Sequence, residues 1–170
     1  MRSAFPLWTQ GHPDCSNLGP PGETMKHSHT RAQETPATLP QADAPRLLLA
    51  EDDSEMRCML SRALRRSGFH VTELRDGRET VSLLSHCATQ TPEQMPHLLI
   101  SDVRMPGCTG LEVLAHLRRS HSCLPVILIT SFGDEETHEE ARRLGAAQVI
   151  DKPFDLDELC AAAWTLVPAS

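Results

Sequence analysis

Acidic, hydroxyl and amine side chains follow the short apolar runs of this sequence. They are Glu51 and Asp52 after LLLA, Asp102 after LLIS, Thr130 after VILI, and Lys152 after QVID. Short apolar runs bounded by polar segments are typical of buried strands. In an open parallel sheet, ligands bind beyond the carboxyl ends of the strands, so we expect these side chains to converge on one edge.

These residue types suit the chemistry of a phosphoryl group. Neighbouring carboxylates repel one another unless a cation neutralises them, and Mg²⁺ prefers oxygen ligands of this kind. A bound ion would let a phosphate dianion approach Asp102, whose carboxylate could then form an aspartyl phosphate. Thr130 would donate a hydrogen bond from its hydroxyl group, and Lys152 would place an ammonium group on a phosphoryl oxygen. Lys152 is the only lysine after residue 45, which favours a specific requirement over a chance surface position.

Amphipathic segments separate the apolar runs, and several begin with a helix start signal. The capping-box spacing occurs at Asp76–Glu79, Thr109–Glu112 and Asp155–Glu158. In the first segment, Asp53 or Ser54 is predicted to cap the helix rather than bind a metal, and Gly68 to end it. One buried face of that helix is predicted from the spacing of Met56, Met59, Leu60, Ala63 and Leu64. The segment 134–143 is expected to be a solvated helix, and Trp164 is expected to be packed.

Strands and helices are therefore expected to alternate along most of the chain. The predicted strands are 47–50, 69–74, 98–100, 126–129 and 147–150. Such alternation predicts βαβ units, an α/β fold with a parallel sheet, and helices on both faces of that sheet. The central runs are continuously apolar, as strands buried on both faces should be.

The 170 residues divide into two unequal regions. Residues 1–45 are rich in proline and lack an apolar period, so they are predicted to be a disordered tail. Residues 46–167 form the predicted domain, and 168–170 are the C-terminal end. About 120 residues suit one such domain.

Composition disfavours several classes of protein. The formal net charge of −7 argues against direct binding of nucleic acid, which needs a clustered basic excess. No apolar stretch approaches the roughly 20 residues of a membrane span, and the start of the chain does not read as a signal peptide. The six cysteines form no CxxC pair, which favours free thiols in a reducing cytoplasm.

Four motifs in order carry a family resemblance. AEDD, SDVRMPG, ITS and DKPF stand at the ends of the predicted strands. In this order they resemble the signature of the receiver (CheY-like) domain of two-component response regulators, over residues 46 to about 167. The resemblance implies a flavodoxin-like (βα)5 fold, doubly wound, with a five-stranded parallel sheet in the order 2-1-3-4-5.

The resemblance also assigns roles by position. Asp102 would be the phosphoacceptor and would share an Mg²⁺ ion with three other groups. Asp52 would bind the ion directly, Glu51 would act through bound water, and the backbone carbonyl of Arg104 would complete the protein ligands. Thr130 would be the switch hydroxyl.

Lys152 would be the phosphate-binding lysine, and the resemblance implies a cis bond between Lys152 and Pro153. Many receivers carry an aromatic residue or histidine three positions before the lysine, whereas this chain has Val149. Aromatic coupling of Thr130 to the helix 4–strand 5–helix 5 face is therefore in doubt.

The function that follows is a stand-alone receiver phosphorylated by a histidine kinase or a histidine phosphotransfer protein. Its output would pass through a downstream protein partner, and a homodimer through the helix 4–strand 5–helix 5 face is possible. The alternatives are a phosphorylation-independent binding module, a fragment of a longer regulator, and an aspartate-nucleophile phosphatase or phosphotransferase. The last is disfavoured because Arg104 stands where such enzymes place a second aspartate.

Overall fold

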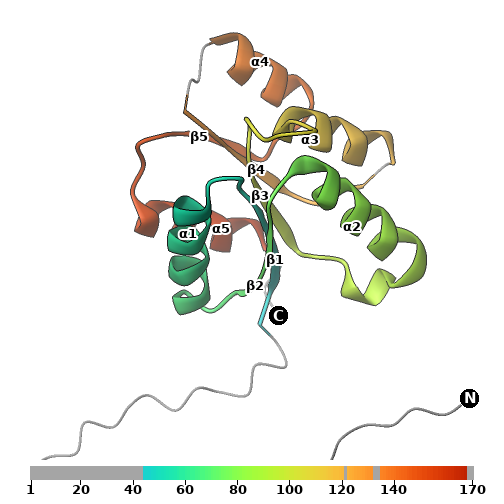
Figure 1. Ribbon diagram of the computed structural model, residues 1–170, viewed down its shortest axis with the longest axis horizontal. Helices are drawn as coiled ribbons and strands as arrows, with labels where there is room; N and C mark the ends of the chain where they lie inside the picture. The colour runs from blue at the N-terminus through green and yellow to red at the C-terminus, as the bar shows by residue number, and fades with distance from the viewer. Residues whose placement is uncertain (1–43, 121, 132–134, 168–170) are drawn as a thin grey trace, which may run out of the picture. The chain divides into compact units, whose positions relative to one another are not determined.

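The computed structural model describes residues 44–120, 122–131 and 135–167. In these ranges five strands alternate with five α-helices (Figure 1). The elements are β1 Arg46–Ala50, α1 Ser54–Arg66, β2 His70–Leu74, α2 Gly77–Gln90, β3 Leu98–Asp102, α3 Gly110–Arg119, β4 Val126–Thr130, α4 Glu135–Arg143, β5 Gln148–Asp151 and α5 Leu156–Leu166. A short 3-10 helix, η2 (Pro92–Gln94), precedes β3. The predicted tail, apart from its last two residues, and the predicted C-terminal end at 168–170 lie outside the described residues.

The five strands form one parallel sheet. Its order is β2-β1-β3-β4-β5, so the predicted fold class and strand order are confirmed. Both β3 and β4 are buried along their whole length. The edge strands are more exposed, since three of the five residues of β2 and two of the four residues of β5 are exposed. This difference explains why the central strands have the most continuous apolar runs.

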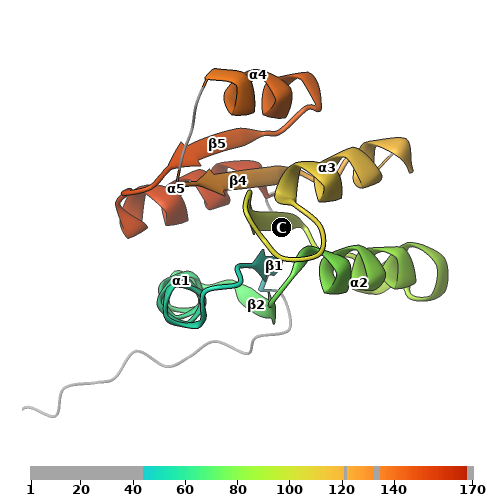
Figure 2. The ribbon, with the colours of Figure 1, turned by 45° about the horizontal axis from the view of Figure 1, so that its top comes forward.

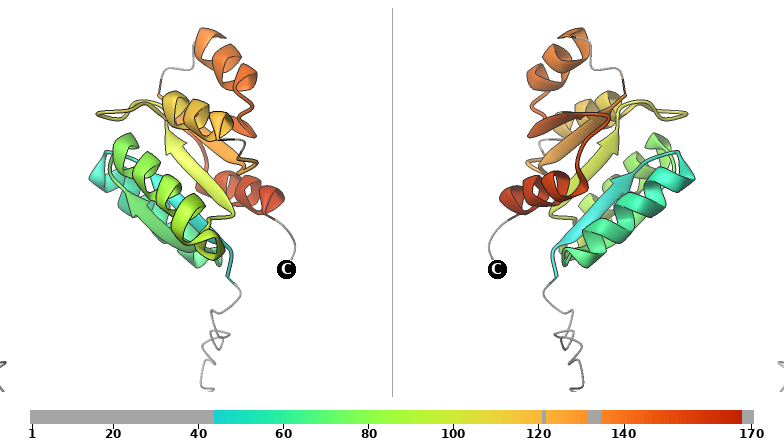
Figure 3. Two further views of the ribbon diagram at one scale, coloured as in Figure 1. Left: turned by 90° about the vertical axis from the view of Figure 1, so that its right-hand side faces the viewer. Right: turned by 90° about the vertical axis from the view of Figure 1, so that its left-hand side faces the viewer.

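Successive strand residues face opposite sides of the sheet and build two separate cores. One core packs Leu47, Leu49, Ile100 and Ile127 against α1 and α5. The other core includes Leu48, Leu99, Val126 and Leu128, with α2, α3 and Ala141 of α4 packed against them. Figure 2 shows α1 and α5 on one side of the sheet and α2 and α3 on the other, and Figure 3 turns each side toward the viewer.

Polar residues begin the helices at the positions that the sequence predicts. Asp53 caps α1 by accepting a hydrogen bond from the backbone N–H of Met56 at 2.7 Å, so its predicted capping role is confirmed. Thr109 and Glu112 form a complete capping box on α3. At α2 the pattern differs, because Glu79 accepts from the backbone N–H of Arg75 instead of closing a box.

A glycine brings α3 close to the end of β3. A Cβ atom on Gly110 would lie 2.4 Å from the carbonyl oxygen of Asp102, so no larger residue fits without movement of the backbone. At the end of α1, Gly68 has a φ of +104°, which supports its predicted role as the helix stop. Gly110 thus sets the distance between α3 and the strand that ends in Asp102.

Two surface features complete the fold. Trp164 packs its ring on Phe69 with centroids 4.6 Å apart, yet 43% of the residue is exposed, so the predicted packing is only partial. In α4 only Ala141 is buried, as expected for a solvated helix. Among the described residues, no helix has both the length and the apolar character that crossing a membrane requires.

Candidate functional site

The carboxyl ends of β1, β3, β4 and β5 meet at one edge of the sheet. Glu51 and Asp52 follow β1 and Lys152 follows β5, as the sequence predicts. Asp102 and Thr130 were predicted to follow their strands and are instead the last residues of β3 and β4. Between them lies an open cavity of about 520 Å³ whose lining includes Glu51, Asp52, Asp102, Arg104, Ser131 and Lys152. The parallel topology therefore brings together residues up to 101 positions apart in the chain.

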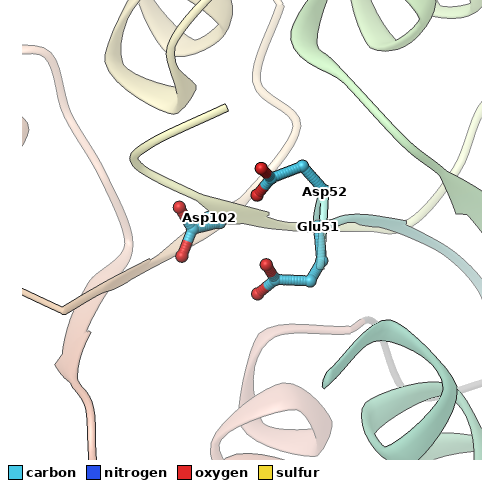
Figure 4. A group of neighbouring side chains, drawn as sticks. All are labelled: Glu51, Asp52 and Asp102. Atoms are coloured by element: carbon cyan, nitrogen blue, oxygen red, sulfur yellow. The ribbon is translucent and has the colours of Figure 1, made fainter. Parts of the chain in front are cut away.

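Three carboxylates face the same space in this cavity. One ligand oxygen from each of Glu51, Asp52 and Asp102 lies within 4.8 Å of the others. Figure 4 shows Glu51 and Asp52 reaching from the end of β1 toward Asp102. Glu51 is only 2% exposed and Asp102 only 5%, whereas Asp52 is exposed. Two buried acids beside a third one require positive charge nearby.

Lys152 supplies one positive charge to this cluster. Its ammonium nitrogen lies 2.7 Å from Oδ1 of Asp102 and 2.9 Å from Oε2 of Glu51, and the side chain is 17% exposed. Burial would lower the pKa of Lys152, but its hydrogen bonds to Asp102 and Glu51 outweigh that effect and the pKa is raised. Burial raises the pKa of Glu51, helped by the charge of Asp102 and opposed by the hydrogen bond from Lys152.

Backbone groups hold the remaining parts of the site. The N–H of Arg104 donates to Oδ2 of Asp102, so both oxygens of this carboxylate are oriented. Thr130 is buried, and its carbonyl accepts a 2.8 Å hydrogen bond from the N–H of Lys152, which ties the end of β5 to β4. The bond between Lys152 and Pro153 is cis, as the resemblance implies.

The donor set suits a hard divalent cation. All the candidate side-chain ligands are carboxylate oxygens, and among the contacts described one ammonium group, that of Lys152, pairs with two of the three carboxylates, Glu51 and Asp102. Mg²⁺ and similar ions take oxygen ligands and neutralise clustered acids, so the residues fit such an ion. Asp53 does not belong to this cluster, since its side chain caps α1.

Most of the chain matches one known family. Residues 47–163 match the model of the response regulator receiver domain. The chain belongs to this receiver family. The match covers the five strands except Arg46 and most of α5, so the family resemblance of the four sequence motifs is confirmed.

Curated relatives of the receiver domain are regulators much longer than the matched region. The DNA-binding transcriptional regulator NtrC of Klebsiella pneumoniae is 38% identical over 113 residues, which cover 66% of this chain and 23% of NtrC. The transcriptional regulatory protein TctD of Salmonella typhimurium is 37% identical over 125 residues, covering 74% of this chain and 53% of TctD. This chain therefore spans about a quarter to a half of these relatives.

Solved receiver structures share the same fold. The receiver domain of the Francisella response regulator 1452 superimposes with a TM-score of 0.65 at 25% identity, covering 72% of this chain and 95% of that one. The receiver domain of the putative response regulator NarL from Mycobacterium tuberculosis superimposes with a TM-score of 0.63 at 26% identity, covering 72% of this chain and 94% of that one.

Several residues around the site differ from the sequence-based predictions or had none. Met56 and Met59, both expected on the buried face of α1, line the cavity. Met56 is still partly buried and packs against the core formed with α1 and α5, as expected, whereas Met59 is 43% exposed. Arg57 received no role, although it contacts the loop that carries Glu51 and Asp52. Val149, in the position where many receivers carry an aromatic residue, packs against the core formed with α2, α3 and α4.

Proposed function

We propose that this receiver domain accepts a phosphoryl group on Asp102 from a histidine kinase or a histidine phosphotransfer protein in an Mg²⁺-dependent reaction. The observation that carries the proposal is the contact of Lys152 with Asp102 and Glu51 beside a third carboxylate. An ammonium group held on a buried carboxylate is placed to contact an oxygen of a phosphoryl group bound there. Family membership supports the same role.

The proposed transfer uses one oxygen of Asp102 as the nucleophile. A lone pair of that oxygen forms the new bond to phosphorus, while the bond between phosphorus and the donor's imidazole nitrogen breaks and its electron pair returns to the imidazole. The N–H of Arg104 and the ammonium of Lys152 orient the carboxylate before attack. Lys152 then moves to a phosphoryl oxygen, and the hydroxyl of Thr130 donates to another.

The cation site is part of the proposal. Glu51, Asp52, Asp102 and the backbone carbonyl of Arg104 would hold Mg²⁺, with Glu51 acting through bound water. When bound, the ion supplies positive charge that offsets the carboxylates and the phosphoryl oxygens.

The output of the domain is proposed to pass through a downstream protein partner in the cytoplasm, without direct contact to nucleic acid. A homodimer through the α4–β5–α5 face is a further proposal. NtrC is described as DNA-binding, but this chain covers only 23% of it. The proposed phosphorylation chemistry is the same whether the chain acts alone or as one segment of a longer regulator.

Intact-mass spectrometry after incubation with Mg²⁺ and acetyl phosphate tests this function. The expected result is one labile phosphoryl group on the wild-type chain and none on Asp102→Asn or without divalent cation. Asp53→Asn is the matched control, because asparagine also caps helices well and the residue lies outside the carboxylate cluster. Uptake by Asp102→Asn at the wild-type level would refute the choice of acceptor. If neither acetyl phosphate nor histidine kinases label the wild-type chain, the phosphorylation-independent binding module replaces this proposal.

A further inference from the structure

Arg57 of α1 lies against the loop that joins β1 to α1. Its Nη1 atom donates to two consecutive backbone carbonyls, that of Glu51 at 2.7 Å and that of Asp52 at 3.1 Å. The side chain is 13% exposed; its contact with Glu51 is partly buried, whereas its contact with Asp52 is exposed to solvent. Charged donors make stronger hydrogen bonds than neutral ones, and partial burial strengthens the contact with Glu51 further.

The two carbonyls belong to the peptide planes on either side of the Asp52 Cα atom. Because peptide groups are planar, fixing both planes fixes the backbone dihedrals of Asp52 and the direction of its Cα–Cβ bond. Glu51 is held differently, through its own backbone N–H to Leu74 and its carboxylate to Lys152. Arg57 therefore acts mainly on Asp52, the exposed member of the carboxylate cluster.

Arg57 is itself held in place from the other side. Its Nε atom lies 3.9 Å from Oε2 of Glu73 in β2, and the carboxylate of Glu73 also accepts hydrogen bonds from Ser61 at 2.7 Å and Arg65 at 3.1 Å. Arg57, Ser61 and Arg65 follow one another at intervals of four residues, which places them along one face of α1. The guanidinium therefore lies near a carboxylate outside the carboxylate cluster, one that it shares with Ser61 and Arg65.

We propose that Arg57 is a positioning residue for the cation site, one that sets the direction of the Asp52 carboxylate through its backbone. This inference rests on the proposed function, because it concerns the same ion. Groups that orient metal ligands without touching the metal typically change its affinity by about 10- to 100-fold when they are removed. A lysine at position 57 offers a single compact ammonium group, which cannot reproduce the planar guanidinium between two carbonyls and Glu73.

Calorimetric titration with Mg²⁺ tests the inference on four forms of the full chain. They are the wild type, Arg57→Gln, Arg57→Lys and Arg65→Gln. Arg65→Gln is the matched control because Arg65 lies on the same helix face and contacts Glu73 and Val71, but not the loop at Glu51 and Asp52. We expect Arg57→Gln to lower Mg²⁺ affinity by about 10- to 100-fold, Arg57→Lys to lower it by less, and Arg65→Gln to leave it unchanged.

A second measurement separates positioning from general stabilisation. Thermal unfolding in EDTA reports the loss of stability of each variant without the ion. If Arg57→Gln or Arg57→Lys unfolds at a lower temperature but keeps wild-type affinity for Mg²⁺, or if Arg65→Gln loses affinity equally, the inference is wrong. Failure of the wild-type chain to bind Mg²⁺ would instead contradict the cation site of the proposed function. Arg57→Lys keeps the positive charge, so its Mg²⁺ affinity tests the inference if Arg57→Gln does not fold.

Discussion

Substituting Lys152 by methionine removes the ammonium group that contacts Asp102 and Glu51 while keeping an unbranched side chain of similar length. Both carboxyl groups are almost fully buried, so the variant leaves two buried acids without their close partner. Removing one partner of a buried ion pair typically costs about 3–5 kcal/mol, whereas an exposed pair contributes at most about 1 kcal/mol. Because the Lys152 side chain is 17% exposed, we expect a value at the lower end of this range: the free energy of unfolding should fall by about 3 kcal/mol at pH 8 without divalent cations.

The loss should depend on pH in a definite direction. In the wild-type chain the pKa of Lys152 is raised, so its contribution to stability is fully present below the ordinary pKa of 10.5 and disappears only as pH rises through the folded-state value. The pKa of Glu51 is also raised, and it should rise further in the variant because the hydrogen bond that lowers it is gone. Glu51 therefore destabilises the variant increasingly as pH rises above its ordinary value of 4.5. At pH 4, with Glu51 protonated, the free energy of unfolding that Lys152→Met loses should fall to about half of its value at pH 8.

Urea unfolding at pH 4, 6 and 8 in EDTA measures these differences in the free energy of unfolding. Arg119→Met serves as the control, because it removes one positive charge from the exposed end of α3. Added Mg²⁺ should stabilise Lys152→Met more than the wild type, since the ion takes the place of the missing charge; binding at 100 times the dissociation constant contributes about 2.7 kcal/mol. Equal stability of Lys152→Met and the wild type at all three pH values would refute this account of the cluster.

Three further substitutions test other parts of the site. Glu51→Gln removes a buried carboxylate but leaves Lys152 paired with Asp102, and the raised pKa of Glu51 means that its charged form is disfavoured in the fold. The free energy of unfolding at pH 8 in EDTA should therefore stay equal or rise by up to about 1 kcal/mol, and a clear loss of stability would contradict this. Calorimetry should show Mg²⁺ affinity lowered at least about 10-fold. Gly110→Ala should lower the free energy of unfolding in urea by about 1–3 kcal/mol, because the new methyl group would meet the carbonyl of Asp102. An unchanged free energy of unfolding would contradict that close approach. Thr109→Ala should lower the free energy of unfolding by about 1 kcal/mol because α3 loses its cap, whereas Thr109→Ser keeps a capping hydroxyl and should not lower it. Equal losses in the two variants would argue against capping.

Much of the fold could be predicted because its signals are local. Continuous apolar runs identify β3 and β4, which are buried on both faces, and Asp53 and Thr109 cap the helices where the sequence indicates. The strand ends were less exact: the predicted third strand stopped at residue 100, two residues before the end of β3, and the predicted fifth strand, 147–150, was shifted by one residue from β5. Two of its four residues are exposed and the others only partly buried, so hydrophobicity marks its ends poorly.

The site could be predicted in composition but not in detail. Strand ends of a parallel sheet share one edge, so Glu51, Asp102 and Lys152 could be grouped without coordinates. The contact of Arg57 with the loop depends on how α1 leaves β1, and no short-range pattern encodes that angle. Met59 was expected to be buried because it fits the helical period of α1, but it lies beside the open cavity at the sheet edge.

Asp102 is the proposed carrier of the phosphoryl group, and chemical trapping identifies the carrier. Borohydride reduces an acyl phosphate to the alcohol, so treating the phosphorylated chain with borohydride and sequencing its peptides by mass spectrometry identifies the modified residue as homoserine. We expect homoserine at position 102 alone, and only when Mg²⁺ and a phosphoryl donor are both present. Homoserine at Asp52 or Asp53, or an unmodified Asp102 in a chain that has taken up one phosphoryl group, would contradict it.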